Sequence, residues 1–159
     1  MNKHRFFHVV LFGLSFLLLS CNQGTKKEDL TGQWKVTDFK TELQGVPVQL
    51  IENAKTIALS TSYDFNPDMT YSMTIARNAL EEGRKHTGTY KIEGGEILLN
   101  PDSLWYKSNS TWTATGKNNF NSPMFEKSKL TVEKNEKNRL IISTNRGEGK
   151  ISYTLERIE

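Results

Sequence analysis

Few side chains in this sequence are suited to nucleophilic, acid–base or metal chemistry. The chain has a single cysteine, Cys21, and His86 is its one histidine beyond the first eight residues. A histidine acting as a base needs a nucleophile and an orienting partner, and a metal site usually needs several ligands. The sequence contains no Gly-x-Ser-x-Gly elbow, no His/Asp cluster and no marked pair of carboxylates. We therefore expect no enzyme activity, no metal site and no cofactor, and we interpret His86 as an ordinary strand residue.

The first twenty residues have the pattern of a signal peptide. Lys3 and Arg5 form a cationic start, and residues 6–19 are nearly all apolar. That run is too short to cross a bilayer comfortably, which takes ~20 apolar residues. A basic start, a short apolar core and a small residue before the cut are typical of export. The alternative, a buried N-terminal helix, would have no polar face to expose to water.

The end of this segment, Leu18-Leu19-Ser20-Cys21, resembles the lipobox of bacterial lipoproteins. The resemblance implies cleavage before Cys21 and attachment of acyl chains, such as palmitate, to that cysteine. Two or more chains matter because one alone gives only marginal anchoring. We expect the protein to be lipid-anchored in the cell envelope, with the outer membrane as the favoured location. The sequence leaves open whether it faces the periplasm or the cell surface.

The chain that remains after cleavage is almost neutral. It has 19 basic and 18 acidic side chains, a net charge of +1, which offers no electrostatic footprint for nucleic acid. Residues 21–29 read as the lipidated cysteine and a polar tether. Residues 30–159 have the usual size of one domain. No feature identifies a protein partner.

Apolar residues recur with a period of two along most of this domain, which predicts half-buried strands. Tyr71 and Met73 share one face, as do Tyr90 and Ile92, and Tyr153 lies in the last strand. Turn residues such as Gly94-Gly95 separate these strands and indicate consecutive hairpins. An up-and-down antiparallel sheet of this kind protects its edges most simply by closing into a barrel.

One segment, residues 47–58, has helical spacing instead. Its apolar residues are Leu50, Ile51, Ala54 and Ile57. A helix this short would be marginal alone in water. We therefore expect its apolar face to rest on the mouth or flank of the barrel, as a lid.

Gly32-Gln33-Trp34 resembles the Gly-x-Trp signature of lipocalin and related calycin barrels, and further motifs resemble lipocalin-like lipoproteins of the Bacteroidetes. Residues 65–71, 88–95 and 153–158 carry that second likeness. The resemblance implies an all-β, up-and-down barrel of about eight strands, with the short helix after the first strand. It also implies that Trp34 plugs the barrel floor and that Arg157 lies across its ring. A ligand-facing Trp34 is the alternative.

The residues expected to face inward are Tyr71, Met73, Tyr90, Ile92 and Tyr153. They either line a pocket for a small apolar or amphipathic ligand or fill the core, since about eight strands permit both. In the filled case the protein would be a non-catalytic protein- or glycan-interaction module, working through residues 104–127. We interpret that segment as a long loop rich in aromatic residues, with Ser110, Trp112 and Ala114 as candidates for a short strand. Asp102-Ser103-Leu104 matches a short O-glycosylation acceptor of exported Bacteroidetes proteins, which makes Ser103 a candidate modification site.

Overall fold

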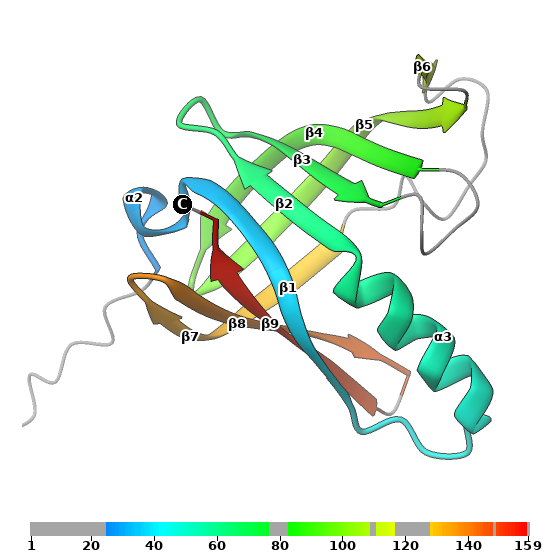
Figure 1. Ribbon diagram of the computed structural model, residues 1–159. Coiled ribbons are helices and arrows are strands. Elements are labelled where there is room, and N and C mark those ends of the chain that lie inside the picture. The colour runs from blue at the N-terminus through cyan, green and yellow to red at the C-terminus, as the bar shows by residue number, and fades with distance from the viewer. Residues whose placement is uncertain (1–24, 77–82, 109–110, 117–127, 148, 159) are drawn as a thin grey trace, which may run out of the picture.

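The computed structural model describes residues 25–76, 83–108, 111–116, 128–147 and 149–158 (Figure 1). The predicted signal peptide and Cys21 lie outside these residues. Within the described residues, no helix is long and apolar enough to span a membrane.

In these described parts of the chain, two helices and nine strands follow one another. Helix α2 (Lys27–Leu30) precedes β1 (Gly32–Thr41), and helix α3 (Val48–Leu59) follows that strand. The other strands are β2 (Thr61–Phe65), β3 (Thr70–Ile75), β4 (Gly83–Glu93), β5 (Glu96–Ser108), β6 (Thr111–Gly116), β7 (Ser128–Glu136), β8 (Arg139–Arg146) and β9 (Gly149–Arg157). Helix α2 includes the last residues of the predicted tether and Leu30, the first residue of the predicted domain.

The strands form one antiparallel sheet that closes on itself. Its order is β4-β3-β2-β1-β9-β8-β7-β5-β6, and β4 also pairs with β5, which completes a ring of eight strands with β6 outside it. Almost all ring neighbours are also consecutive in the sequence. The predicted all-β, up-and-down barrel of about eight strands, with one short helix after the first strand, is confirmed.

The hairpin turns lie where the sequence predicts them. Gly94 and Gly95 join β4 to β5 with φ angles of 58° and 82°, a backbone that glycine adopts without steric cost. The β2–β3 turn ends at Met69, whose φ is 67°. Its backbone is held by the Met69 amide, which donates to the Asn66 carbonyl oxygen at 3.1 Å.

The segment expected to be mostly a long loop, residues 104–127, is largely strand in its first part. Strand β5 continues through Trp105 and Tyr106 to Ser108, and Trp112 lies in β6. Leu104 is fully buried. The loop prediction is wrong for residues 104–108 because the cross-strand pairing of β5 with β4 and β6 outweighs the local polarity of the sequence. The short strand considered around Trp112 and Ala114 corresponds to β6. Residues 117–127 lie outside the described residues.

Helix α3 lies along the barrel and packs against β1 (Figure 1). Ala58 is its buried residue, and Ile51 packs on the core. Leu50, expected on the same apolar face, is 56% exposed. The helix therefore rests on the barrel mainly through its C-terminal half, and Leu50 is not part of the contact.

The hydrophobic core is complete within the barrel. Its buried members run from Leu30 to Leu155 and come from all eight strands of the ring, with Ala58 added by α3. Among the described residues, the core cluster begins at Leu30 and the ring of eight strands is closed, so the chain from residue 22 onward contains every described part of this domain.

Candidate ligand-binding cavity

The strand register assembles one wall of the barrel interior. Tyr63 on β2 lies opposite Met73 on β3, and Met73 lies opposite His86 on β4. Alternate residues of a strand point to the same face, so these three side chains share the inner surface. The opposite wall contains Ser128 of β7, which pairs with Leu99 of β5.

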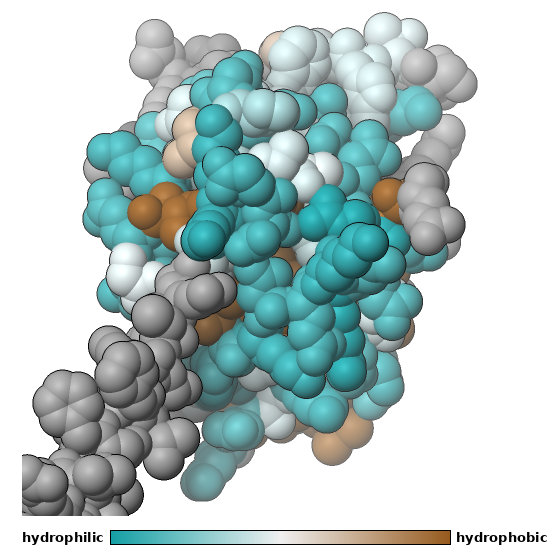
Figure 2. Space-filling view, turned by 90° about the vertical axis from the view of Figure 1, so that its left-hand side faces the viewer, coloured by the Kyte–Doolittle hydropathy of each residue, from teal (hydrophilic) through white to brown (hydrophobic). Residues whose placement is uncertain are grey.

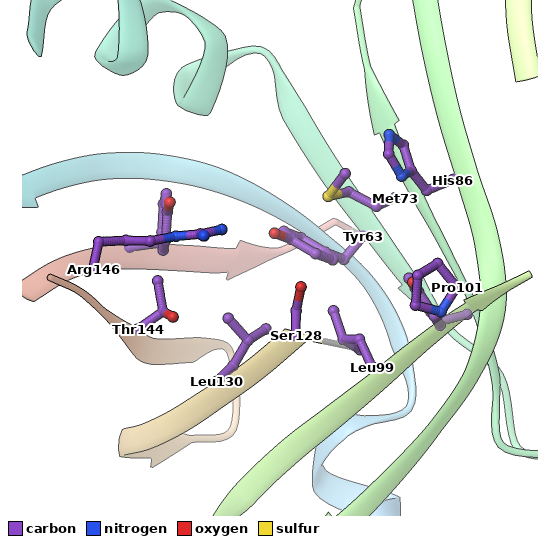
Figure 3. Close-up of a pocket in the computed structure, with 11 residues that line it drawn as sticks. Tyr63, Met73, His86, Leu99, Pro101, Ser128, Leu130, Thr144 and Arg146 are labelled. Carbon is purple, nitrogen blue, oxygen red and sulfur yellow. The ribbon is translucent and has the colours of Figure 1, made fainter. Parts of the chain in front are cut away.

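These walls enclose a cavity of about 370 Å³ (Figure 3). It is lined by Tyr63, Tyr71, Met73, His86, Leu99, Pro101, Ser128, Leu130, Thr144, Arg146 and Tyr153. Arg146 and Ser128 are also solvent-exposed. The cavity therefore reaches the surface beside the turn between β8 and β9.

A second cavity of about 300 Å³ lies beneath α3. Its lining is mostly apolar: Val36, Phe39, Ala54, Ile57, Ala58, Thr61, Tyr63, Met73, Ile75, Ile151 and Tyr153. Tyr63, Met73 and Tyr153 line both cavities, so these three side chains form the partition between them. Tyr153 is positioned in part by Phe39, whose ring meets it edge-on at 5.8 Å.

The ionisable groups of the cavity are neutral at pH 7, with the exception of Arg146. Burial and the neighbouring Tyr153 and Tyr71 hold the pKa of Tyr63 well above its usual range. Burial and the charge of Asp102 raise the pKa of Tyr71 to about 12. Burial, and secondly the charge of Arg84, lowers the pKa of His86 below its ordinary value of 6.5. The tyrosine hydroxyls are therefore protonated donors, and the imidazole carries no charge.

The opposite end of the barrel is closed by Trp34, which is fully buried. Its indole Nε1 donates a hydrogen bond to the Leu30 carbonyl oxygen at 2.7 Å. The Arg157 guanidinium lies 4.3 Å from the centre of the indole ring, a cation–π geometry. Trp34 lines neither cavity, so the structure places it as a floor residue and not as a ligand-facing one.

Arg157 also ties three separate segments together at this floor. Its guanidinium donates to the carbonyl oxygens of Thr31 at 2.6 Å, Asp29 at 2.8 Å and Lys137 at 3.1 Å. The C-terminal strand is thereby fixed to α2 and to the β7–β8 turn, and these elements lie together in Figure 1. The outer face at this end is largely hydrophilic (Figure 2).

Gly32 has a physical role in the same arrangement. Its φ of 125° disfavours any residue with a side chain, and a Cβ at this position would lie 2.5 Å from Nη1 of Arg157. The glycine of Gly-x-Trp thus leaves room for the guanidinium above the indole. This role of Gly32 was not predicted from the sequence, although the expected position of Arg157 across the Trp34 ring could have suggested it.

The structure places the sequence-derived pocket residues in two groups. Tyr71, Met73 and Tyr153 line the cavity of about 370 Å³. Ala54 and Ile57 of α3 line the second cavity, beneath the helix. Tyr90 and Ile92 line neither cavity. Tyr90 is 1% exposed, packs edge-on against Phe65 at 5.1 Å and donates its hydroxyl to the Asn66 carbonyl oxygen, so it belongs to the core.

Several lining residues were not identified from the sequence. Tyr63 was missed although it alternates with Ser62 and Asp64 in a short strand, a pattern that would have placed it inside. His86 was interpreted as an ordinary strand residue, and it does lie within β4, but its imidazole is on the cavity wall. Arg146 was also missed, although it alternates with Ile142 and Thr144 along β8, a pattern that places it on the inner face.

The two cavities leave space inside the barrel that the described side chains do not fill. The interaction-module alternative assumed a filled interior. Ser103 lies within β5, half-buried, between Thr87 of β4 and Gly116 of β6.

Among the described residues, no group of three or more His, Cys, Asp or Glu side chains could hold a metal ion.

Comparison with known proteins finds similar structures only. No family model matches the chain, and no curated protein matches its sequence. A lipocalin-like protein from Bacteroides uniformis is 19% identical, with 82% of this chain and 99% of that chain covered and a TM-score of 0.45. An uncharacterized protein from Bacteroides eggerthii is 14% identical, with 80% and 98% covered and a TM-score of 0.47. Both likenesses concern the fold alone.

Proposed function

We propose that this chain is a lipid-anchored binding protein of the bacterial cell envelope, which holds a small apolar or amphipathic molecule inside its barrel without transforming it. The observation that carries this proposal is the cavity of about 370 Å³. Binding pockets for small molecules typically measure ~300–1,000 Å³ and combine apolar walls with a few polar groups. This cavity has that composition, with Met73, Leu99 and Leu130 beside hydroxyl groups and one guanidinium.

The sequence supports the anchor. The apolar run and the lipobox-like residues before Cys21 predict export and acylation, and outer-membrane attachment is the simplest destination. Metabolic labelling with an alkyne analogue of palmitate tests this directly. We expect the wild-type chain to be labelled and to fractionate with membranes, and the Cys21→Ala variant to lose both properties. Equal labelling of the two proteins would exclude Cys21 as the anchor.

The binding function is tested with residues 22–159 and the uncharged fluorophore N-phenyl-1-naphthylamine. Its fluorescence increases when it leaves water for an apolar cavity. We expect saturable binding at one site per chain. Met73→Trp should weaken this binding at least tenfold, because Met73 lines both cavities and a larger side chain there occupies them.

Thr74→Trp is the matched control. Thr74 is the next residue of β3, its side chain points to the other face of the sheet, and it lines neither cavity. It introduces the same indole without filling the interior. Circular dichroism and urea unfolding establish that both variants are folded. Equal binding by the two variants would place the fluorophore on the outer surface and refute the proposed function.

A further inference from the structure

The charge of the cavity wall indicates which class of molecule it accepts. Arg146 is the one lining side chain that is charged at neutral pH, and the described lining of both cavities includes no Asp or Glu. Asp102 is close enough to raise the pKa of Tyr71, but its carboxylate accepts a hydrogen bond from Thr87 and does not line the cavity. The field inside is therefore positive, which favours an anion and disfavours a cation.

The neutral polar groups of the wall act in the same direction. The hydroxyls of Tyr63, Tyr71 and Tyr153 are donors at any physiological pH, and Thr144 and Ser128 add two more hydroxyls. Figure 3 shows the Arg146 guanidinium and the Tyr63 hydroxyl directed toward each other across the cavity. Hydrogen bonds from such donors are strongest when the acceptor is ionised. A carboxylate between these groups would accept several of them at once.

The second cavity has the opposite character. The lining beneath α3 has no charged side chain, and its polar groups are limited to the hydroxyls of Thr61, Tyr63 and Tyr153. Met73 lies on the partition between the two cavities. Methionine is unbranched and has three rotatable bonds, so it can move aside for a chain more readily than the tyrosines beside it.

We propose that the ligand is an amphipathic monoanion, whose carboxylate is held by Arg146 and the tyrosine hydroxyls and whose apolar chain extends past Met73 into the space beneath α3. This inference rests on the proposed function, because it names the chemistry of the molecule bound at the same cavity. It assigns Arg146 to recognition of the head group and Ala54 and Ile57 of α3 to contact with the tail.

The head group is tested with three molecules that share a ten-carbon chain: decanoate, 1-decanol and decyltrimethylammonium. Each is titrated against residues 22–159 to displace N-phenyl-1-naphthylamine. The two ionic compounds are kept below their critical micelle concentrations, and 1-decanol is kept below its solubility limit. We expect decanoate to bind at least tenfold more tightly than the cation. Arg146→Gln should weaken decanoate about tenfold or more and leave 1-decanol within twofold.

Arg139→Gln is the control for this substitution. Arg139 is at the other end of the same strand, is exposed and does not line either cavity, so its loss should leave decanoate binding unchanged. An Arg146→Gln variant that binds decanoate as the wild type does would overturn the inference. So would an equal loss of decanoate and 1-decanol, which would show a structural role for Arg146.

The tail is tested by chain length. In the wild type, affinity should increase about fourfold for each methylene between hexanoate and decanoate, as expected when each one leaves water. Ala54→Trp should remove this increase because the indole fills the space beneath α3 from an exposed helical position. Lys55→Trp, on the next residue of the helix, should retain it. An unchanged increase in Ala54→Trp would place the tail elsewhere.

The outcomes separate the two proposals. If the fluorophore binds inside the barrel but decanoate displaces it no better than 1-decanol, the proposed function stands and the inference about the anion is wrong. If neither the fluorophore nor any ten-carbon compound binds, both are wrong.

Discussion

Replacement of Arg157 by Met should destabilise the barrel by about 3 kcal/mol. The guanidinium makes three hydrogen bonds to backbone carbonyl oxygens, and a bond from a charged donor contributes about 1.5–3 kcal/mol when it is shielded from water. Only the bond to Thr31 is part-buried. The bonds to Asp29 and Lys137 are exposed, so water replaces them at little cost. We therefore count about 1.5 kcal/mol for the bond to Thr31 and a few tenths of a kcal/mol for each of the two exposed bonds. The cation–π contact adds about 0.5–1 kcal/mol.

Urea unfolding of residues 22–159, followed by tryptophan fluorescence, measures this difference. Arg157→Lys should lose about half as much, because an ammonium retains the charge but cannot reach three carbonyl oxygens in a plane. Arg139→Met should change the free energy of unfolding by less than about 0.5 kcal/mol, as expected of an exposed arginine. If Arg157→Met cost less than about 1 kcal/mol, the closure of the floor by Arg157 would be an incidental contact, and our reasoning about this end of the barrel would be refuted.

Three further predictions concern other parts of the barrel. Gly32→Ala should destabilise by about 1–3 kcal/mol because of its φ of 125° and the displaced guanidinium, and near-UV circular dichroism should show a changed Trp34 signal; an unchanged spectrum would contradict this. Ala58→Asp should cost about 3 kcal/mol or more as a buried unpaired charge, whereas Leu50→Asp should be nearly neutral in the same urea assay, and equal losses would show that α3 sits differently. Finally, the folded state holds the pKa of His86 below 6.5, so its contribution to stability is complete above that pH and is lost as pH falls toward the lowered pKa. The free energy of unfolding lost between pH 7.5 and pH 5 should therefore be smaller in His86→Gln, which has no imidazole to protonate. Glu133 and Glu136 do not obscure this difference, because their lowered carboxyl pKa values affect stability only below about pH 4.5. Parallel pH profiles of the two proteins would rule out His86 as the cause.

The fold was predictable because its signals are local. Alternation in β3, β4 and β9, the Gly94-Gly95 turn and the helical spacing that corresponds to α3 are each visible within about ten residues. Antiparallel neighbours that follow one another along the chain then leave few alternatives to an up-and-down barrel. The end of β5 after Leu104 was misread because it depends on pairing with β4, which is about twenty residues away. Polar, aromatic-rich sequence carries no local sign of such pairing.

The cavity was predictable only in part, because alternation specifies the inner face but not the height along the barrel. Tyr71 and Tyr90 both point inward, yet Tyr71 reaches the cavity and Tyr90 packs against Phe65 near the floor. That difference is set by strand tilt and register, which place Tyr71 opposite Gly88. Arg146 shows a different limit: it is the last residue of β8 and shares the inner face with Ile142 and Thr144, but Gly147 directly after it hides the end of this strand in the sequence.

The two ends of this barrel are therefore subject to different constraints. At the floor, Gly32, Trp34 and Arg157 depend on one another: the glycine leaves the space, the indole offers its face, and the guanidinium joins three backbone segments. A change in any one of them alters the other two, so this end should tolerate few substitutions. The cavity residues near the β8–β9 turn have no comparable interdependence among the described contacts. Arg146 could be exchanged for another polar residue with little effect on folding but a large effect on the ligand. The same barrel could then acquire a different ligand without loss of its closed end, and for that reason the motif that identifies the fold carries so little information about what the protein binds.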